Sequence, residues 1–384
     1  MKKISSFELA AIVLASAAFL FFLDRSILSK ETVNLRPQEP KPPFPYYQEE
    51  VRFENPGAGI KLAGTLTLPT REGIFPAVVL LSGGGASDRN EAFLGHKPFL
   101  VIADYLTRNG IAVLRFDDRG INQSQGDHLA ATTADFATDA ESAVDYLKTR
   151  KEINPGQIGL AGHSEGGMIA PMVAARSKDI AFIIMLAGPG MPVDSAILLQ
   201  IAALHRVRKY PEARIRQAQE VFAGALAIVK QSTDRVALRQ ELTRYIRANL
   251  DSVSAFTTDS ASLEQSRTAT INNLSSIWTQ SLVKYDPIPA LEKVACPILA
   301  LNGEKDYQVP PKEHLRGIAN ATRKNGNKNV KLVELPGLNH LFQECKTGGP
   351  EEYRRSTQTF SPMALKVMSD WIGQITGPQP SSYK

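Results

Sequence analysis

The sequence is poor in the residues that bind metals or nucleic acids. It has 2 cysteines and 6 histidines among 384 residues, and no stretch clusters Cys and His at metal-ligand spacing. The formal net charge is only +5, and no run of like charges is interleaved with aromatic residues, as nucleic-acid binding would favour. There is no internal repeat. The composition therefore predicts neither a metal site nor a nucleic-acid partner.

The two cysteines, Cys296 and Cys345, are expected to remain unbridged. Cys296 precedes a predicted strand that ends near Gly303, whereas Cys345 follows His340, which is expected near the other end of that strand. Even a short strand separates its ends by about 20 Å, and a disulfide cannot cover that distance.

A long apolar run occurs near the N-terminus. Within residues 1–30, Lys2 and Lys3 precede an apolar run over residues 9–23. This pattern is typical of an export signal or a short signal-anchor, and it is shorter than the about twenty residues of a usual membrane span. Small-x-small triplets lie inside the run rather than after it, which favours a retained anchor. We expect an exported, extracytoplasmic or periplasmic protein, anchored to the inner membrane through residues 9–23.

Residues 31–49 carry several prolines and predict an extended tether between this anchor and a folded body. Strands and helices alternate from residue 50 to 190 and again over residues 287–384. The strands are apolar runs of the kind that are buried on both faces of a sheet. Such alternation implies a mostly parallel, doubly wound sheet with helices on both faces. The expected strands are a hairpin at 51–54 and 61–68, then 77–81, 111–116, 158–161, 180–187, 297–301 and 330–335.

Strand signals disappear between residues 191 and 286. Apolar residues such as Ile215, Phe222 and Val229 recur there at helical spacing. This stretch is interpreted as a helical insertion between two strands of the sheet. Its apolar faces would either line a pocket or pack onto the core.

The central motif is Gly-His-Ser-Glu-Gly-Gly at residues 162–167. Gly-x-Ser-x-Gly alone is a weak signal, but here a buried strand enters it and an apolar-faced helix leaves it. A serine on such a strand-to-helix turn is presented above the edge of the sheet. Ser164 is therefore the candidate nucleophile.

A serine hydroxyl needs a base, and the base needs an orienting acid. In the elbow arrangement, both follow the serine along the chain, the acid first. Asp306 follows the predicted strand at 297–301, with Glu304 as the alternative acid, and His340 follows the strand at 330–335. Both loops open at the same sheet edge as Ser164. Asp306 and His340 are the candidate acid and base.

The other histidines are given no catalytic role. His163 lies in the elbow and is expected to point elsewhere. His205 is expected to be solvated in the helical insertion, and His314 to lie on a surface helix. His96 and His128 occupy loops before the nucleophile and are at most candidates for lining a pocket.

A tetrahedral intermediate also needs an oxyanion hole. One donor is expected to be the backbone N–H of Glu165, which follows the nucleophile. The other is expected from the Gly-rich loop after residues 77–81, with Gly84 favoured and Gly83 next. Glycine lets the bare backbone come close to a substrate oxygen.

Four motifs together resemble bacterial α/β-hydrolases of the serine aminopeptidase and acyl-esterase type. They are Ser-Gly-Gly-Gly-Ala-Ser-Asp-Arg-Asn at 82–90, Arg-Phe-Asp-Asp-Arg-Gly at 115–120, residues 162–167, and Asn-Gly-Glu-Lys-Asp at 302–306. The resemblance implies an α/β-hydrolase fold with an inserted helical cap at 191–286, and the triad of Ser164, Asp306 and His340. The chain departs from the pattern at Ser82 and at Asn122, where relatives commonly have histidine and glycine.

The expected activity is hydrolysis of a small-molecule carboxylic ester through an acyl-enzyme on Ser164, without a cofactor. An aminopeptidase-like serine peptidase with the same triad is an alternative, and it would need a carboxylate for the substrate's amino terminus, such as Glu212, Glu220 or Glu241. An acyltransferase is a second alternative. All three chemistries depend on the same nucleophile.

Overall fold

The computed structural model describes residues 36–253, 260–324 and 326–377. The described chain divides into two compact units. The larger one comprises the described residues up to Met191 and from Pro287 onward, and the smaller one comprises Pro192–Asp286. The predicted anchor at 9–23 lies outside the described residues. Within the described ranges, no helix combines the length and apolarity needed to cross a bilayer.

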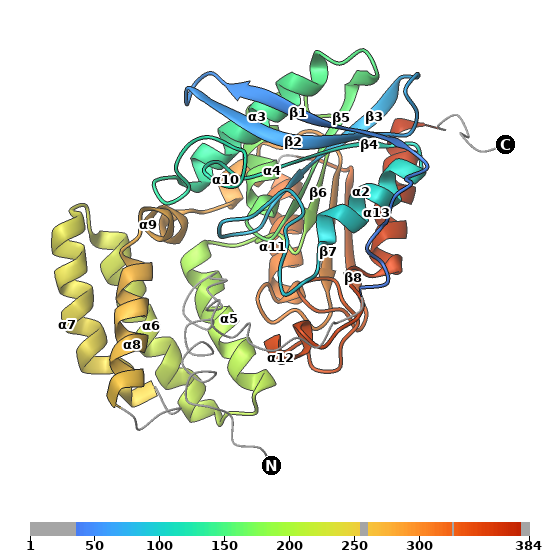
Figure 1. Ribbon diagram of the computed structural model, residues 1–384. Coiled ribbons are helices and arrows are strands. Elements are labelled where there is room, and N and C mark those ends of the chain that lie inside the picture. Colours follow the sequence, from blue (N-terminus) through green and yellow to red (C-terminus); the bar gives the residue numbers. More distant parts are fainter. Residues whose placement is uncertain (1–35, 254–259, 325, 378–384) are drawn as a thin grey trace. The chain divides into compact units, whose positions relative to one another are not determined.

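The larger unit is built on one sheet of eight strands in the order β1-β2-β4-β3-β5-β6-β7-β8 (Figure 1). β1 and β2 form an antiparallel hairpin, β2 pairs antiparallel with β4, and the remaining pairs are parallel. The mostly parallel sheet confirms the predicted fold class. The strands are β1 Tyr47–Asn55, β2 Ile60–Leu68, β3 Phe75–Leu81, β4 Ala112–Phe116, β5 Ile153–His163, β6 Phe182–Leu186, β7 Ile298–Gly303 and β8 Val330–Leu335.

The central strands are buried along their length because helices cover both faces of the sheet. Every residue of β3, β6 and β7 is buried, which explains their continuous apolar sequences. β8, at the edge, is exposed or only partly buried up to its last residue, Leu335, which is buried. The carboxyl ends of β3, β5, β7 and β8 share one edge of the sheet because these strands run parallel.

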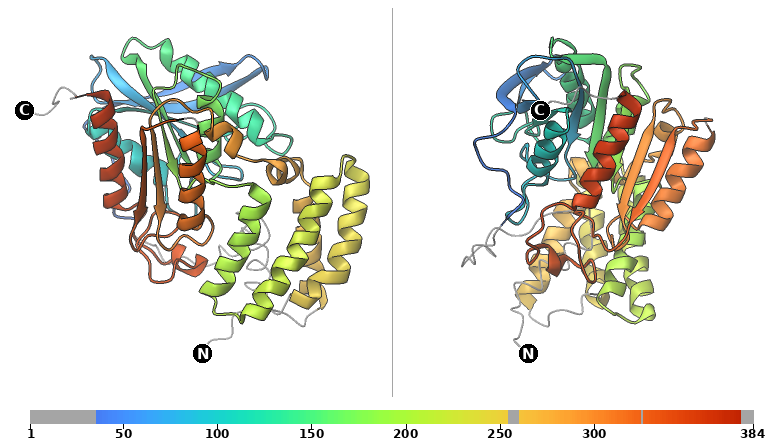
Figure 2. Two further views of the ribbon diagram at one scale, coloured as in Figure 1. Left: turned by 180° about the vertical axis from the view of Figure 1, so that it is seen from behind. Right: turned by 90° about the vertical axis from the view of Figure 1, so that its right-hand side faces the viewer.

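The helices of the larger unit lie in two layers (Figures 1 and 2). α2 and α13 contact each other on one face, while α3, α4, α10 and α11 form the layer on the other. Phe182 of β6 meets Trp371 of α13 edge-on, with ring centroids 5.8 Å apart. The bounds are α2 Pro98–Arg108, α3 Thr133–Lys148, α4 Gly166–Ala174, α10 Ile288–Leu291, α11 Pro311–Lys324, α12 Pro350–Tyr353 and α13 Pro362–Thr376.

In its described residues, the smaller unit consists of helices joined by short loops. Its helices are α5 Val193–Val207, α6 Glu212–Gln231, α7 Arg235–Val253, α8 Ser260–Leu274 and α9 Ile277–Lys284. Ile215, Phe222 and Val229 are buried on α6, which packs against α5 and α7. The bounds of the smaller unit, Pro192–Asp286, differ by one residue from those expected for the helical insertion, 191–286. A capping role for the unit remains a prediction.

The described part of the Pro-rich segment is packed onto the larger unit. Arg36 donates to the carbonyl of Ser356 at 2.8 Å, and Gln38 donates to the carbonyl of Phe360 at 2.7 Å. Side-chain to backbone bonds of this kind fix an extended segment without secondary structure. The semi-rigid tether expected over residues 31–49 is thus held against the larger unit from Arg36 onward, and its last residues belong to β1, which begins at Tyr47.

Candidate active site

Ser164 lies on the sharp turn between β5 and α4, and its backbone is strained. Its φ is +53°, a region that residues with a Cβ seldom occupy. The turn is possible because Gly162 and Gly166, two residues before and after the serine, lack side chains. A Cβ on Gly162 would lie 1.9 Å from the carbonyl oxygen of Gly166, and one on Gly166 would lie 2.2 Å from that of Leu81. This is the geometry predicted for a nucleophile elbow.

His340 and Asp306 form a buried hydrogen-bonded pair. Nδ1 of His340 lies 2.8 Å from Oδ2 of Asp306, and both side chains are fully buried. The other carboxylate oxygen of Asp306 accepts the amides of Gln308 at 2.8 Å and Val309 at 2.9 Å. Those amides fix the carboxylate, which in turn fixes the imidazole ring. Nε2 of His340 is buried and has no hydrogen-bond partner in the described part of the chain.

Glu304, the alternative acid, is hydrogen-bonded to a backbone amide and not to His340. Its Oε2 accepts the amide of Gly337 at 2.7 Å, on the exposed side of the turn. Of the two carboxylates, the structure therefore pairs Asp306 with His340. The contact of Glu304 ties the loop after β7 to the loop after β8.

The Gly-rich loop after β3 adjoins the elbow. A Cβ on Gly83 would lie 3.3 Å from Cβ of Ser164, so this position has little room for a side chain. The amide of Gly83 donates to Oε1 of Glu91 at 2.7 Å. Since that N–H is already used, Gly84, which is buried, is the better oxyanion candidate of the two glycines. Glu165, the other candidate, directly precedes α4.

Two of the sequence motifs bind each other around this loop. Arg89 donates through its amide to Oδ1 of Asp117 at 2.9 Å and through its guanidinium to Oδ2 at 2.7 Å. Asn122, which stands where relatives commonly have glycine, has φ +47° and donates to Asp117 at 3.3 Å. Asparagine tolerates this backbone region better than most residues, so Asn122 fits the left-handed conformation of the loop.

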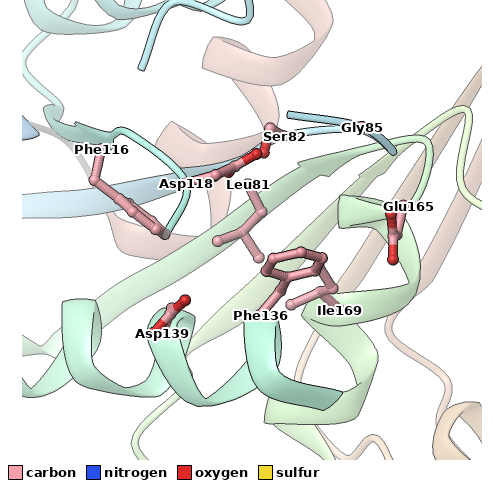
Figure 3. A pocket seen from close by; sticks show the side chains of 10 residues that line it. Leu81, Ser82, Gly85, Phe116, Asp118, Phe136, Asp139, Glu165 and Ile169 are labelled. Atoms are coloured by element: carbon pink, nitrogen blue, oxygen red, sulfur yellow. The ribbon is translucent and has the colours of Figure 1, made fainter. Parts of the chain in front are cut away.

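A small cavity of about 20 Å³, lined by both polar and apolar side chains, lies under the Gly-rich loop (Figure 3). Its volume suits about one water molecule. Asp118 is buried there, with 9% of its surface exposed, and accepts from Oγ of Ser82 at 2.7 Å and the amide of Ser87 at 2.9 Å. Burial outweighs these bonds and raises the pKa of Asp118 to about 8, with a further rise from the nearby Glu165 and Glu91.

Two histidines, His314 and His205, are more buried than the sequence suggested. His314 lies on α11, as expected, but it is buried, and its Nδ1 accepts the amide of Gly190 at 3.1 Å. His205, expected to be solvated, is only 6% exposed. Both lie on the apolar faces of their helices, so helical spacing from neighbours such as Leu315 and Ile318 would have placed His314 inside.

Sequence reasoning missed two residues beside the elbow, Glu91 and His163. Nδ1 of His163 lies 2.8 Å from Oε1 of Glu91, and its Nε2 lies 3.0 Å from the carbonyl oxygen of His340. Nothing in the local pattern singles out Glu91, which is 72 residues from its partner.

Both cysteines are free, as predicted. The described residues hold no group of His, Cys, Asp and Glu suited to a metal ion.

The sheet, the strained serine turn and the His–Asp pair together define an α/β-hydrolase. Residues 97–344 match the Hydrolase_4 family, described as serine aminopeptidase, S33, and the chain belongs to this family. The α/β-hydrolase GrgF of Penicillium sp. sh18 has a similar structure, with a TM-score of 0.52 and 19% identity over 85% of this chain and 98% of its own. At that identity, the likeness concerns the fold alone.

Among curated proteins, the chain is similar to Esterase EstD of Thermotoga maritima. The two are 26% identical over 300 residues, which is 78% of this chain. The match spans 62% of the length of that relative. The family prediction made from the motifs is thus confirmed.

Proposed function

We propose that this chain hydrolyses small-molecule carboxylic esters through an acyl-enzyme on Ser164. The observation that carries the proposal is the His340–Asp306 pair. Asp306 accepts a hydrogen bond from the Nδ1–H of His340, so the lone pair of the imidazole is on Nε2, the atom left without a partner among the described residues. That is the state a general base needs before it takes a serine proton.

The reaction proceeds by acyl transfer in two steps. Oγ of Ser164 attacks the ester carbonyl while Nε2 of His340 takes its proton. His340 then returns that proton to the leaving alcohol, as the C–O bond to the alcohol breaks. A water molecule, deprotonated in the same way, attacks the acyl-enzyme and releases the acid and the serine.

The oxyanion of each tetrahedral intermediate is held by backbone amides. The proposed donors are the N–H groups of Glu165 and Gly84. Amides fixed in place before the reaction cost no reorganisation when charge develops. The close approach of the Gly-rich loop to Ser164 supports this assignment, as does the hydrogen bond that holds Gly83.

Removal of the nucleophile is the direct test. The Ser164→Ala variant should lose p-nitrophenyl butyrate turnover by about 10⁶-fold in kcat, with an unchanged circular dichroism spectrum. Ser195→Ala, at an exposed position of α5, is the matched control and should keep full activity. Turnover retained in a folded Ser164→Ala enzyme would reject the nucleophile.

A serine aminopeptidase with the same triad is the second candidate, because the matching family carries that description. It would need a carboxylate to bind a free amino terminus. Glu212, one candidate, already pairs with Arg206 at 3.0 Å, which leaves Glu220 and Glu241. We favour the esterase, in line with the similarity to EstD. Comparing aminoacyl-anilide with short-chain ester turnover separates the two, and added alcohol would reveal an acyltransferase.

We further propose that the protein is exported and held at the membrane by residues 9–23. The support is the positively charged start followed by the apolar run. Cell fractionation of the full chain, with and without residues 1–30, is the measurement. Equal recovery of both forms in the cytoplasmic fraction would contradict export.

A further inference from the structure

His163 lies between two hydrogen-bond acceptors at the edge of the active site. Its Nδ1 is 2.8 Å from a carboxylate oxygen of Glu91, and its Nε2 is 3.0 Å from the carbonyl oxygen of His340. The side chain is 7% exposed, so water has little access to either nitrogen. The ring centroids of His163 and His340 are 4.8 Å apart.

The positions of these acceptors determine the protons on the ring. A backbone carbonyl can only accept, so Nε2 of His163 must carry hydrogen. On the other side, Oε1 of Glu91 also receives the amide of Gly83 at 2.7 Å, as an ionised carboxylate does. Nδ1 then carries hydrogen too, and His163 is an imidazolium paired with the Glu91 carboxylate.

The electrostatics of the site agree with that proton count. Burial lowers the pKa of His163, but the charge and hydrogen bond of Glu91, the carbonyl of His340 and the charge of Asp306 outweigh it, so the pKa is raised above 6.5. Glu91 itself has φ +50°. A strained residue persists only where its surroundings fix it.

The pair joins three segments that are distant in the chain. Glu91 binds the Gly-rich loop through the amide of Gly83, His163 directly precedes the nucleophile, and its Nε2–H binds the backbone of the general base. A Cβ on Gly83 would lie 3.2 Å from Oε1 of Glu91 and 3.4 Å from Nδ1 of His163. The contacts leave little freedom between these segments.

We propose that Glu91 and His163 form a charged positioning pair that holds the oxyanion loop and the loop of His340 against the elbow. Neither residue reacts with substrate; they fix the relative places of Ser164, His340 and the Gly-rich loop. The kinetic consequence rests on the proposed function, whereas the charged state of the ring does not.

The kinetic test separates the hydrogen bond from the charge. Glu91→Ala removes both, and kcat for p-nitrophenyl butyrate should fall by about 10- to 100-fold, as displacement of catalytic groups by about 1 Å can cause, with KM nearly unchanged. Glu91→Gln still offers an oxygen to Gly83 but loses the charge, and it should fall between Glu91→Ala and wild type. Glu141→Gln, which removes a carboxylate on α3, is the control and should match wild type. Wild-type kcat in both Glu91 variants would overturn the proposal, and so would an equal loss in the control.

A spectroscopic test decides the charged state in the absence of turnover. In protein labelled with ¹⁵N-histidine, both ring nitrogens of His163, assigned through their loss in His163→Gln, should give imidazolium shifts at pH 7.5. The same shifts should persist in Ser164→Ala, which removes the nucleophile alone, and should disappear in Glu91→Gln. A neutral His163 in wild type would overturn the pair, even if ester hydrolysis is established. Imidazolium shifts in a chain that hydrolyses no ester would reject the proposed function and retain the pair.

Discussion

At the scale of single residues, the carboxylates of Asp306 and Asp118 have different roles because their hydrogen-bond partners and their burial differ. Asp306 accepts two amides and an imidazole N–H, so its partners are all donors and they hold both carboxylate oxygens in place. Asp118 accepts from a hydroxyl and one amide while burial raises its pKa to about 8. Asp306 orients the imidazole of His340, whereas Asp118 holds the Gly-rich loop and is largely uncharged at pH 7.

At about pH 4, close to the pKa of the unfolded carboxyl, Asp118→Asn should have a free energy of unfolding within about 1 kcal/mol of wild type. Its amide can donate to Ser82 and its oxygen can accept from Ser87. Asp118→Ala leaves both groups without a partner and should cost about 1–3 kcal/mol. Urea unfolding measures both.

The pH dependence gives a second readout for the same variants. The folded state holds the Asp118 proton more strongly than the unfolded chain, whose carboxyl has the ordinary value of 3.8. Its contribution to stability is therefore lost as pH rises from 3.8 through about 8. Asp118→Asn does not titrate, so it should gain stability relative to wild type as pH rises from 3.8 to about 8, and the difference should stay constant above that. An Asn variant as unstable as Ala at pH 7 would contradict the neutral state.

At the scale of elements, the buried His314 of α11 makes the stability of the fold depend on pH. Burial of His314 lowers its pKa to about 4, with a further decrease from His340 and an opposing attraction by Asp306. Its Nδ1 must stay unprotonated to accept the Gly190 amide. Protonation would cost both that bond and the desolvation of a charge.

We expect acid to destabilise the fold partly through His314. Because its folded pKa is depressed, its contribution is present above 6.5 and lost as pH falls from 6.5 toward about 4, with a slope of up to about 1.4 kcal/mol per pH unit. His314→Gln can keep an acceptor for Gly190 without titrating, so its melting temperature should fall less between pH 6.5 and 4. Parallel curves for the two proteins would show that His314 does not titrate in this range.

The sheet elements were predictable because each signal is local. β8 matches its predicted bounds, residues 330–335, and β3 and β7 agree with their continuous apolar sequences. β5 begins earlier than predicted, at Ile153, because the polar residues Asn154 and Gln157 interrupt its apolar pattern. The strand-to-helix turn at Ser164 was likewise visible, since its glycines stand at fixed positions.

At the scale of the whole molecule, the sequence predicts the arrangements that the order of strands imposes. The carboxyl ends of β5, β7 and β8 meet at one edge, so the residues just beyond those strands were expected to gather there. The contact of His163 with Glu91 and the packing of Arg36 depend on loop conformations, which have no periodic signal. Their energies come from pairings between distant residues, and these appear only in the folded chain.

The central claim is that the hydroxyl of Ser164 is activated by the pair of His340 and Asp306. Labelling of the full chain with a fluorophosphonate, followed by mass spectrometry of the peptides, tests it most directly. The account predicts one adduct on Ser164, formed rapidly in wild type and strongly slowed in His340→Ala and Asp306→Asn. An adduct on another serine, or labelling of Ser164 that is unaffected by both variants, would contradict it.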